Sequence, residues 1–277
     1  MGLVISTNSS SLVAQRALSE SSENQMRAYE QLSSGKRITR AGDDAAGLSI
    51  SEGLRAEIRS LHQAKRNASD GISFIQVAEG GMNEVSNILV RLRELAIQAA
   101  SDTIGDRERG FVNNEFKSLI KEVDRIARVS NFNGTPLLSG DAKKDVLEIQ
   151  VGTSNTESDR IGFNVNENNV KTDALGIDDI SADTIKGARS SLDNIDKALE
   201  KVNASRARLG ALQNKLQSTV RTIQISTENY AQARSRIADT DVAEVSANLV
   251  RDNILQSAGV SVLAQANSAP AQALKLI

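Results

Sequence analysis

The chain has no cysteine and no tryptophan, and only one histidine and two prolines among its 277 residues. The absence of cysteine excludes disulfides and thiolate metal sites. The aromatic residues are five Phe and two Tyr, which is few, because aromatic side chains supply the largest buried areas in compact cores. A single globular enzyme domain is therefore not expected, and the aliphatic and small-polar composition suits long helix-to-helix seams instead.

Charge is missing at the two ends of the chain. The first 15 residues carry no charged side chain, and residues 254–277 carry only Lys275. Such strips are more often buried against another copy of the protein than left in water. The net charge of −2 gives no basis for binding nucleic acid or an anionic membrane. We also expect no membrane insertion, since the C-terminal strip is too rich in Gln, Asn and Ser, and the first residues do not resemble a signal peptide.

No catalytic constellation is visible in the sequence. His62 lies within a predicted helix and lacks the partners that a metal site needs, and no phosphate loop or nucleophile elbow occurs. The pairs Asp43–Asp44 and Asp178–Asp179 each precede a predicted helix, so we interpret them as helix caps. The arginines between Arg91 and Arg128 alternate with carboxylates, which leaves no basic stripe for nucleic acid. We therefore expect no enzyme activity and no catalytic, cofactor-binding or metal-binding residues.

Two long segments repeat apolar residues at every seventh position. The first column runs from Leu54 to Ala96, and the second runs without a break from Ala188 to Ile237. This repeat is typical of a coiled-coil seam, and about 1.5 Å per residue makes each predicted rod about 80 Å long. Gly80–Gly81 within the first rod is interpreted as close packing or a local kink. The predicted seam residues are Leu54, Leu61, Ile75, Leu89, Ile195, Val202, Leu209, Leu216 and Ile223.

The segment between the rods has a different pattern. A shorter helix fits residues 112–126, and Asn131–Pro136 predicts a turn. Apolar residues then alternate over 147–151 and 161–165 around the polar loop 152–160, which predicts a β-hairpin. The predicted fold is mainly α, with long antiparallel coiled-coil rods, a small β-hairpin patch and both termini helical at the same end.

Several short blocks resemble one known family. Leu32–Ile38 (LSSGKRI), followed by Asp43–Leu48 (DDAAGL), looks like the N-terminal signature of bacterial flagellins. The blocks 67–73, 91–98, 208–214, 233–239 and 256–267 are similar to the same family. Together they cover roughly residues 1–135 and 185–277. On these blocks the chain is identified as a short flagellin, without room for the outer domains of larger relatives.

The resemblance implies a structural subunit that is exported unfolded, polymerises with itself and forms the extracellular filament used for swimming. It implies an inner-tube domain made of residues 1–42 and 238–277, and an outer-tube domain made of 43–184 and 185–237. The absence of cysteine suits an unfolded cargo that must not cross-link. The expected polymerisation strips contain Leu3, Ile5, Leu12, Leu255, Val262, Leu263 and Leu274.

The family also implies partners. These are other copies of the chain, an export chaperone, and the cap and junction proteins of the flagellum. In flagellins sensed by innate immunity, an Arg, a Leu, a Gln and a Glu contact a Toll-like receptor. The matching positions are Arg91, Leu95, Gln98 and Glu115, and the first three share one helical face.

Two alternative functions remain open at this point. A hook–filament junction protein would share the design of the terminal strips. A coiled-coil signalling protein would show comparable heptads, although it would normally carry a transmembrane span.

Overall fold

The computed structural model describes residues 7–141 and 144–274, and describes side chains as far as residue 268. The chain divides into two compact units. The first consists of Met1–Ile58 with Glu228–Ile277, and the second is Arg59–Thr227. Both boundaries fall inside the longest helices, α2 (Ala45–Ala99) and α5 (Ile185–Ala238). The division expected from the sequence, at 42/43 and 237/238, lies nearer the helix ends and stays a prediction.

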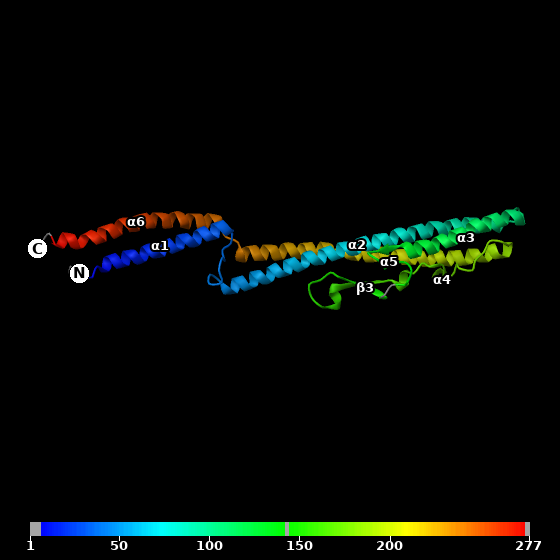
Figure 1. Ribbon diagram of the computed structural model, residues 1–277, viewed down its shortest axis with the longest axis horizontal. Coiled ribbons are helices and arrows are strands. Elements are labelled where there is room, and N and C mark those ends of the chain that lie inside the picture. The colour runs from blue at the N-terminus through cyan, green and yellow to red at the C-terminus, as the bar shows by residue number, and fades with distance from the viewer. Residues whose placement is uncertain (1–6, 142–143, 275–277) are drawn as a thin grey trace. The chain divides into compact units, whose positions relative to one another are not determined.

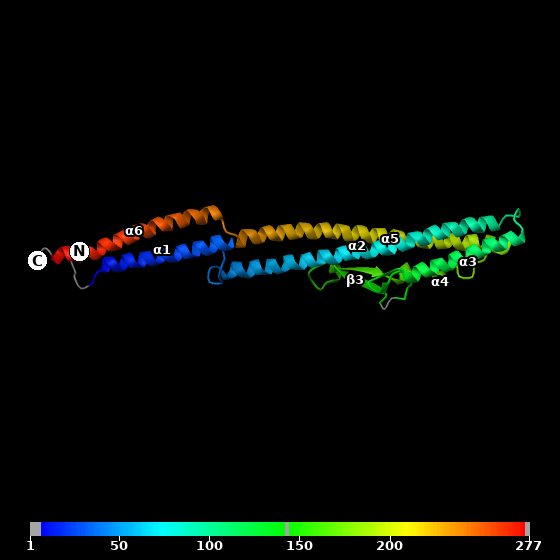
Figure 2. The ribbon, with the colours of Figure 1, turned by 45° about the horizontal axis from the view of Figure 1, so that its top comes forward.

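Helices α1 (Ser9–Ser34) and α6 (Val242–Leu274) dominate the first unit and lie side by side (Figures 1 and 2). The first described turn of α1 contacts α6 near its C-terminal end, since Asn8 bonds the carbonyl of Ala266. The pair is therefore antiparallel. Asn8 also caps α1 by accepting the N–H of Ser11 at 3.0 Å, and Gly35 ends the helix at φ 67°.

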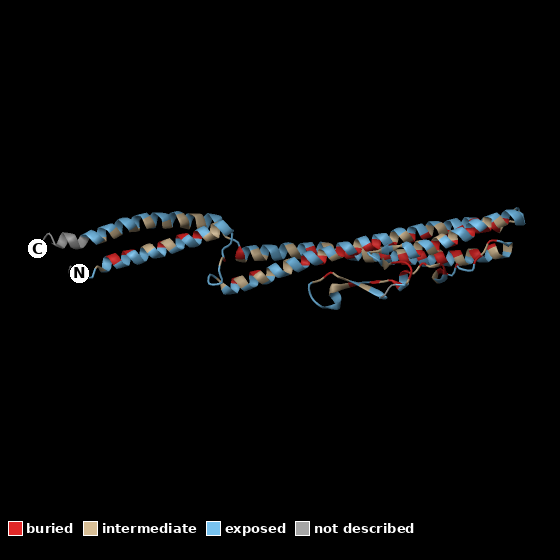
Figure 3. Ribbon diagram, in the orientation of Figure 1, coloured by how far each residue is buried: buried red, intermediate tan, exposed pale blue. Residues whose placement is uncertain are grey.

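The second unit is built on the remaining lengths of α2 and α5, joined by α3 (Asp106–Val129) and the short α4 (Thr172–Leu175). Figure 3 shows the buried residues gathered along the inner faces of these helices. Arg93 on α2 bonds Asp196 on α5 at 2.7 Å, while Leu61 packs with Ile223, so the two helices run antiparallel. The predicted fold of long antiparallel helices is confirmed.

Most of the predicted seam lies in the core of the second unit. Leu54, which belongs to the first unit, is only half-buried. The buried members are Leu61, Ile75, Leu89, Ile195, Val202, Leu209, Leu216 and Ile223.

Two small antiparallel sheets complete the second unit. Strands β1 (Asn131–Phe132) and β2 (Thr135–Pro136) are joined by Asn133 and Gly134, which have φ of 49° and 76°. Positive φ at both positions is the requirement of a type I′ turn. Strands β3 (Val146–Gln150) and β4 (Arg160–Asn164) pair with Leu147 opposite Phe163, as the predicted hairpin requires. Two 3₁₀ turns, η1 (Glu157–Asp159) and η2 (Asn166–Asn168), flank β4.

Side chains from both sheets pack on α2. The Phe74 ring packs nearly perpendicular to the rings of Phe132 and Phe163, with ring centroids 5.8 and 4.6 Å away. Further along α2, a Cβ added at Gly81 would lie 2.7 Å from Leu138 Cδ1 and from Ser130 Oγ, whereas Gly80 faces open space. Close packing therefore explains Gly81 and gives no reason for Gly80.

Candidate assembly surface

Helix α1 buries small and polar side chains and exposes several of its large apolar ones. Its buried residues are Ser11, Ala14, Ser21, Gln25 and Ala28, spaced by three, four or seven positions. A face with this spacing points to one side of a helix. Four large side chains point away from it and are 55–62% exposed: Leu12, Val13, Met26 and Tyr29.

Helix α6 also exposes large apolar side chains. Its outward apolar side chains are 53–64% exposed and comprise Val242, Val250, Ile254, Leu255, Val260 and Val262. A water-facing helix pair normally carries its apolar residues inside. The α1–α6 pair therefore has an apolar surface that is unpartnered in a single chain.

The predicted polymerisation strips coincide in part with this surface. Leu12, Leu255 and Val262 are exposed, and Leu263 is half-buried. Leu3 and Ile5 lie outside the described residues, as does the side chain of Leu274.

The two helices are joined by polar contacts where a coiled coil would normally place aliphatic ones. Each of four hydrogen bonds runs from a side chain of α1, or from its cap residue Asn8, to a polar group of α6. The bonds are Asn8 Nδ2 to the Ala266 carbonyl (2.8 Å), Ser11 Oγ to Asn267 Oδ1 (2.7 Å), Ser21 Oγ to the Asp252 carbonyl (3.1 Å) and Gln25 Nε2 to Asn253 Oδ1 (3.2 Å).

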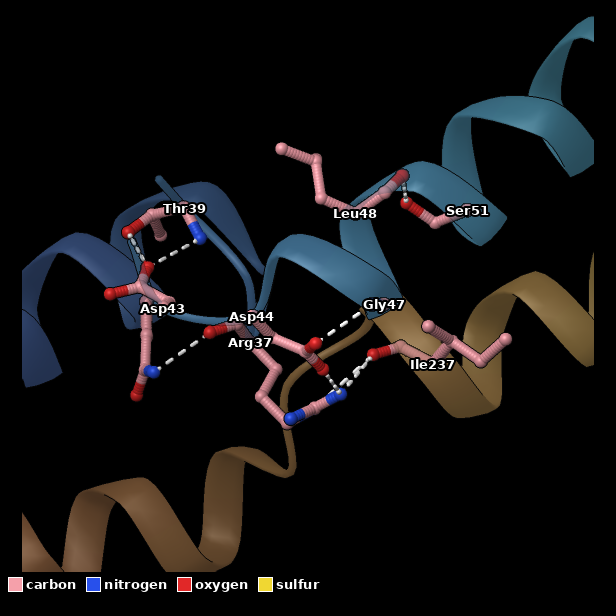
Figure 4. Close-up of polar contacts among 9 residues, drawn as sticks. Arg37, Thr39, Asp43, Asp44, Gly47, Leu48, Ser51 and Ile237 are labelled. Atoms are coloured by element: carbon pink, nitrogen blue, oxygen red, sulfur yellow. Dashed lines mark hydrogen bonds and ion pairs between the residues drawn. The ribbon is translucent and has the colours of Figure 1, made fainter. Parts of the chain in front are cut away.

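The loop after α1 is fastened to the end of α5 (Figure 4). The guanidinium of Arg37 donates to the Ile237 carbonyl at 2.8 and 3.2 Å and reaches Asp44 at 3.4 Å. On either side, the backbone of Arg37 donates to Ala238 and that of Thr240 donates to Gly35. These hydrogen bonds form one short ladder, which joins the loop after α1 to the loop after α5.

The Asp43–Asp44 pair supports the same loop. Asp43 accepts the N–H and hydroxyl of Thr39 and the N–H of Arg40, and these bonds, led by the Arg40 backbone, lower the pKa of Asp43. Asp44 accepts the N–H of Gly47 at 2.7 Å and so caps α2. The cap interpretation is confirmed for Asp44, while Asp43 closes the turn before it. Gly47 is required, since its Cβ would come within 2.3 Å of the Asp44 carboxylate.

The four residues matched to a receptor contact lie in the second unit and do not form one exposed patch. Arg91, Gln98 and Glu115 are exposed, but Leu95 is 1% exposed and belongs to the core. Arg91 bonds Glu94 and Glu115, both at 2.9 Å, and these bonds raise the pKa of Arg91, with Glu94 contributing most. The surface therefore presents three of the four side chains, two of them paired with each other.

Sequence reasoning missed the buried Arg109, which is 3% exposed. Its guanidinium donates to the carbonyls of Ala99, Ser101 and Ile104 and to Asp106 at 2.6 Å. It thereby satisfies carbonyls at the C-terminal end of α2 and in the following turn. In the sequence this residue looked like one more member of an exposed charged face.

Two other kinds of feature are absent from the described residues. In the ranges 7–141 and 144–274, no three His, Cys, Asp or Glu side chains converge as metal ligands would. No described helix combines the length and apolarity needed to span a bilayer.

Comparison with known proteins accounts for both ends of the chain. Residues 5–143 match the family model for the bacterial flagellin N-terminal helical region, and residues 192–277 match that for the C-terminal helical region. The chain is 41% identical to a flagellin of Halalkalibacterium halodurans, over 99% of this chain and 100% of that protein. It is 37% identical to a flagellin of Bacillus subtilis, over 99% of each. A Treponema phagedenis flagellar filament 33 kDa core protein is also 37% identical, over 99% of this chain and all of that protein.

Two solved structures share the fold. The crystal structure of Bacillus cereus flagellin, 28% identical, aligns with a TM-score of 0.51 over 57% of this chain and 88% of that one. A putative flagellar hook-associated protein from Vibrio parahaemolyticus aligns with a TM-score of 0.58 over 71% of this chain and 100% of that one. At 16% identity, the second likeness concerns the fold alone.

Proposed function

This chain belongs to the bacterial flagellin family, and we propose that the exposed apolar strips of α1 and α6 are the surface through which its copies polymerise. As a flagellin it is a structural, non-enzymatic subunit of the extracellular flagellar filament, and it serves motility. The observation that carries the proposal is that the α1–α6 pair exposes large apolar side chains, whereas α1 buries small and polar ones.

The energetics favour a neighbouring copy as the partner of these strips. Burying apolar surface yields about 25 cal/mol per Å², and a pair with a small, polar seam gains little of this within one chain. Fixing a helical segment costs about 1–2 kcal/mol per residue in backbone entropy. We infer that the two helices become fully ordered when the outward strips pack on neighbours, through contacts that do not close on themselves, as a helical filament requires.

The two units have separate roles in this proposal. The α1–α6 pair forms the inner tube, and the helices and hairpin of the second unit form the outer tube. The loop 152–160 faces the medium, in keeping with its exposed polar residues Thr153, Ser154, Asn155, Thr156 and Ser158.

Further partners are proposed from the family. An export chaperone and the cap and junction proteins of the flagellum would meet the chain before and during assembly. A Toll-like receptor would contact the monomer through Arg91, Gln98 and Glu115, while Leu95 supports that surface from the core. An Arg91→Ala variant should then lose potency in a receptor reporter assay, whereas the exposed Arg125→Ala should not. Equal potency of all three proteins would count against this contact.

The junction-protein alternative is less well supported. Its argument is the shared fold of the Vibrio hook-associated protein, but that protein is 16% identical while the flagellins reach 41% over the whole chain. Copy number separates the two: a filament subunit is present in every layer and a junction protein in a single one. The signalling-protein alternative falls with the family assignment.

Seeded polymerisation tests the assembly surface. Purified monomer is mixed with short filament seeds, and elongation is followed by electron microscopy. The wild-type chain should elongate, whereas Leu255→Asp and a chain lacking residues 264–277 should not. Ser154→Asp places the same charge in the loop 152–160, which this proposal directs to the medium, and serves as the matched control. Normal filaments from Leu255→Asp would refute the proposal.

A further inference from the structure

The polar contacts between α1 and α6 follow the seven-residue repeat. Ser11 meets Asn267 and Gln25 meets Asn253. Ser11 and Gln25 lie 14 residues apart (25 minus 11), and so do their partners (267 minus 253). Two hydrogen-bonded pairs, two heptads apart, therefore correspond to the same alignment of α1 with α6. The α1 members are 7% and 8% exposed, so their polar groups depend on these partners.

The buried alanines of the seam do not select an alignment. Ala14 and Ala28 are small and alike, and they would fit against many residues of α6. A slip of seven residues keeps every side chain on the same face of its helix, yet it moves α6 about 10 Å along α1. After such a slip the outward strip of α6 would no longer stand beside that of α1 as it does in this structure.

Polar partners make the slipped alignments unfavourable. A slip in one direction puts Val260 opposite Gln25, and a slip in the other puts Val260 opposite Ser11. In either case a buried polar group loses its hydrogen bond to an apolar side chain, and that loss costs more than the bond contributes when made. A single polar residue in an apolar seam fixes coiled-coil register in the same way.

A steric contact marks the same alignment. A Cβ added at Gly259 would lie 3.3 Å from Leu18 Cδ1, so Leu18 rests on the bare backbone of α6. A slip by one heptad would place Leu18 against Asp252 or Ala266 instead. Glycine is unfavourable inside a helix, and this contact gives a reason for its presence.

We propose that Ser11, Gln25, Asn253 and Asn267, with Leu18 over Gly259, are positioning residues that set the register of α1 against α6. Their role is to hold the two apolar strips in the alignment that neighbouring copies recognise. A stronger apolar seam would bind the helices without specifying where they meet. The inference rests on the proposed function, namely that these strips polymerise.

The test replaces a polar pair of the seam with apolar side chains. The variant Gln25→Leu with Asn253→Leu removes one polar pair and adds apolar contact. The matched control, Gln25→Asn with Asn253→Gln, swaps the two amides and keeps the pair. Ser11→Val with Asn267→Leu repeats the test at the other end of the helices, in case the first variant does not become helical.

Two readouts are combined in the full chain. The first is the rate of seeded elongation. The second is the distance between spin labels at Glu23→Cys and Gln265→Cys, measured in the soluble chain before seeds are added, so that chains in every register contribute. The natural chain has no cysteine, so only these sites react. The labels lie about 15 Å apart along the pair in the observed register, and about 5 or 25 Å apart after a slip of one heptad.

The apolar variant should show two further label distances beside the native one and elongate about threefold more slowly, because three equally populated registers leave about a third of the chains competent. The amide swap should keep one distance and the wild-type rate. A single native distance in the apolar variants, at any rate of growth, would overturn the inference, and so would slippage in the amide swap. If instead the wild type fails to elongate or Leu255→Asp elongates normally, the proposed function itself is wrong and the register inference falls with it.

Discussion

The two units use the same seven-residue repeat in opposite ways. In the second unit the repeating positions of α2 and α5 hold large aliphatic side chains, such as Ile75, Leu89 and Leu209, all at most 1% exposed. In the first unit the inward positions of α1 hold residues such as Ser11 and Gln25, while large side chains such as Leu12 and Tyr29 face outward. The second unit is stabilised by its own apolar core, whereas the first unit exposes apolar side chains of the kind that would form a core.

The contrast separates stability from assembly. Large buried side chains each contribute about 1.5–3 kcal/mol, so the second unit has enough burial to hold its fold as a single chain. The α1–α6 pair gains less from its seam and offers its apolar surface to neighbours. Mutations in the two regions should therefore differ in kind as well as in size.

The largest effect is expected in the seam of the second unit. Leu209→Asp places a charge at a position that is 1% exposed, and it should lower the free energy of unfolding by about 3–5 kcal/mol, from the lost apolar contacts and the buried charge. Thermal melting of the full-length monomer, followed by circular dichroism, measures this. Asn214→Asp, on the exposed side of α5, is the control and should melt like the wild type. Equal melting of Leu209→Asp would show that this column is not the core seam.

Hydrogen exchange should reveal the contrast in the unmodified protein. In the monomer, amides of α1 and α6 should exchange at least about a hundredfold faster than those of the second unit, because their opening costs less free energy. In the filament the α1 and α6 amides should become protected, whereas the second unit should change little. Mass spectrometry of both states measures the difference. Protected α1 and α6 amides in the monomer would mean that the pair is stable without neighbours.

The sequence predicted the second unit better than the first. A column of large aliphatic residues admits one interpretation, so residues such as Val202 and Leu216 could be assigned to the core before the structure was known. The alternation on either side of the loop 152–160 likewise specified the hairpin. On α1 the sequence indicated that the apolar residues seek another copy, but nothing marked Ser11 and Gln25 as the inward face, since buried polar residues have no distinctive pattern.

Two other features escaped prediction for physical reasons. Arg91, Leu95 and Gln98 share one broad helical face, and spacing alone does not reveal that Leu95 turns inward at its edge. Arg109 is buried because it donates to backbone carbonyls at the end of α2 and in the following turn. Every residue has a backbone carbonyl, so the sequence does not show which carbonyls need a partner. Both errors concern which side of a correctly predicted helix a residue occupies.

Adjacent glycines offer a sharper test of close packing in the second unit. Gly81→Ala should destabilise the protein by about 1–3 kcal/mol, because its Cβ would lie 2.7 Å from Leu138 and Ser130. Gly80→Ala meets nothing within 4 Å and should stabilise α2 by about 0.5–1 kcal/mol. The two changes are chemically identical, so opposite shifts in melting temperature would isolate packing as the cause. Shifts of the same sign would contradict the assigned packing at Gly81.

A smaller effect is expected at the loop ladder of the first unit. Arg37→Ala removes the guanidinium bonds to the Ile237 carbonyl and the contact with Asp44. With half of the side chain exposed, we expect a loss of about 0.5–1 kcal/mol in local stability. Exchange of the Thr240 amide, which donates to Gly35, should accelerate a few-fold. The control is Arg40→Ala, whose side chain pairs with Glu30 instead, and it should leave that amide unchanged. Equal acceleration in the two variants would mean that Arg37 has no special role in the ladder.

The smallest effect is the pH response of the turn closed by Asp43. Folding lowers the pKa of this carboxyl below its ordinary value of 3.8, through the Arg40 N–H first, then the Thr39 hydroxyl and N–H, with a weaker contribution from the charge of Arg27. A lowered pKa means that the folded turn favours the carboxylate, so its contribution is present above pH 3.8 and is lost as the pH falls below that value. The Thr39 and Arg40 amide resonances should therefore titrate with a midpoint below 3.8. Asp43→Asn should abolish that titration and loosen the turn at neutral pH, while leaving the second unit untouched. A midpoint at or above the ordinary value would show that the three hydrogen bonds do not hold the carboxylate in solution.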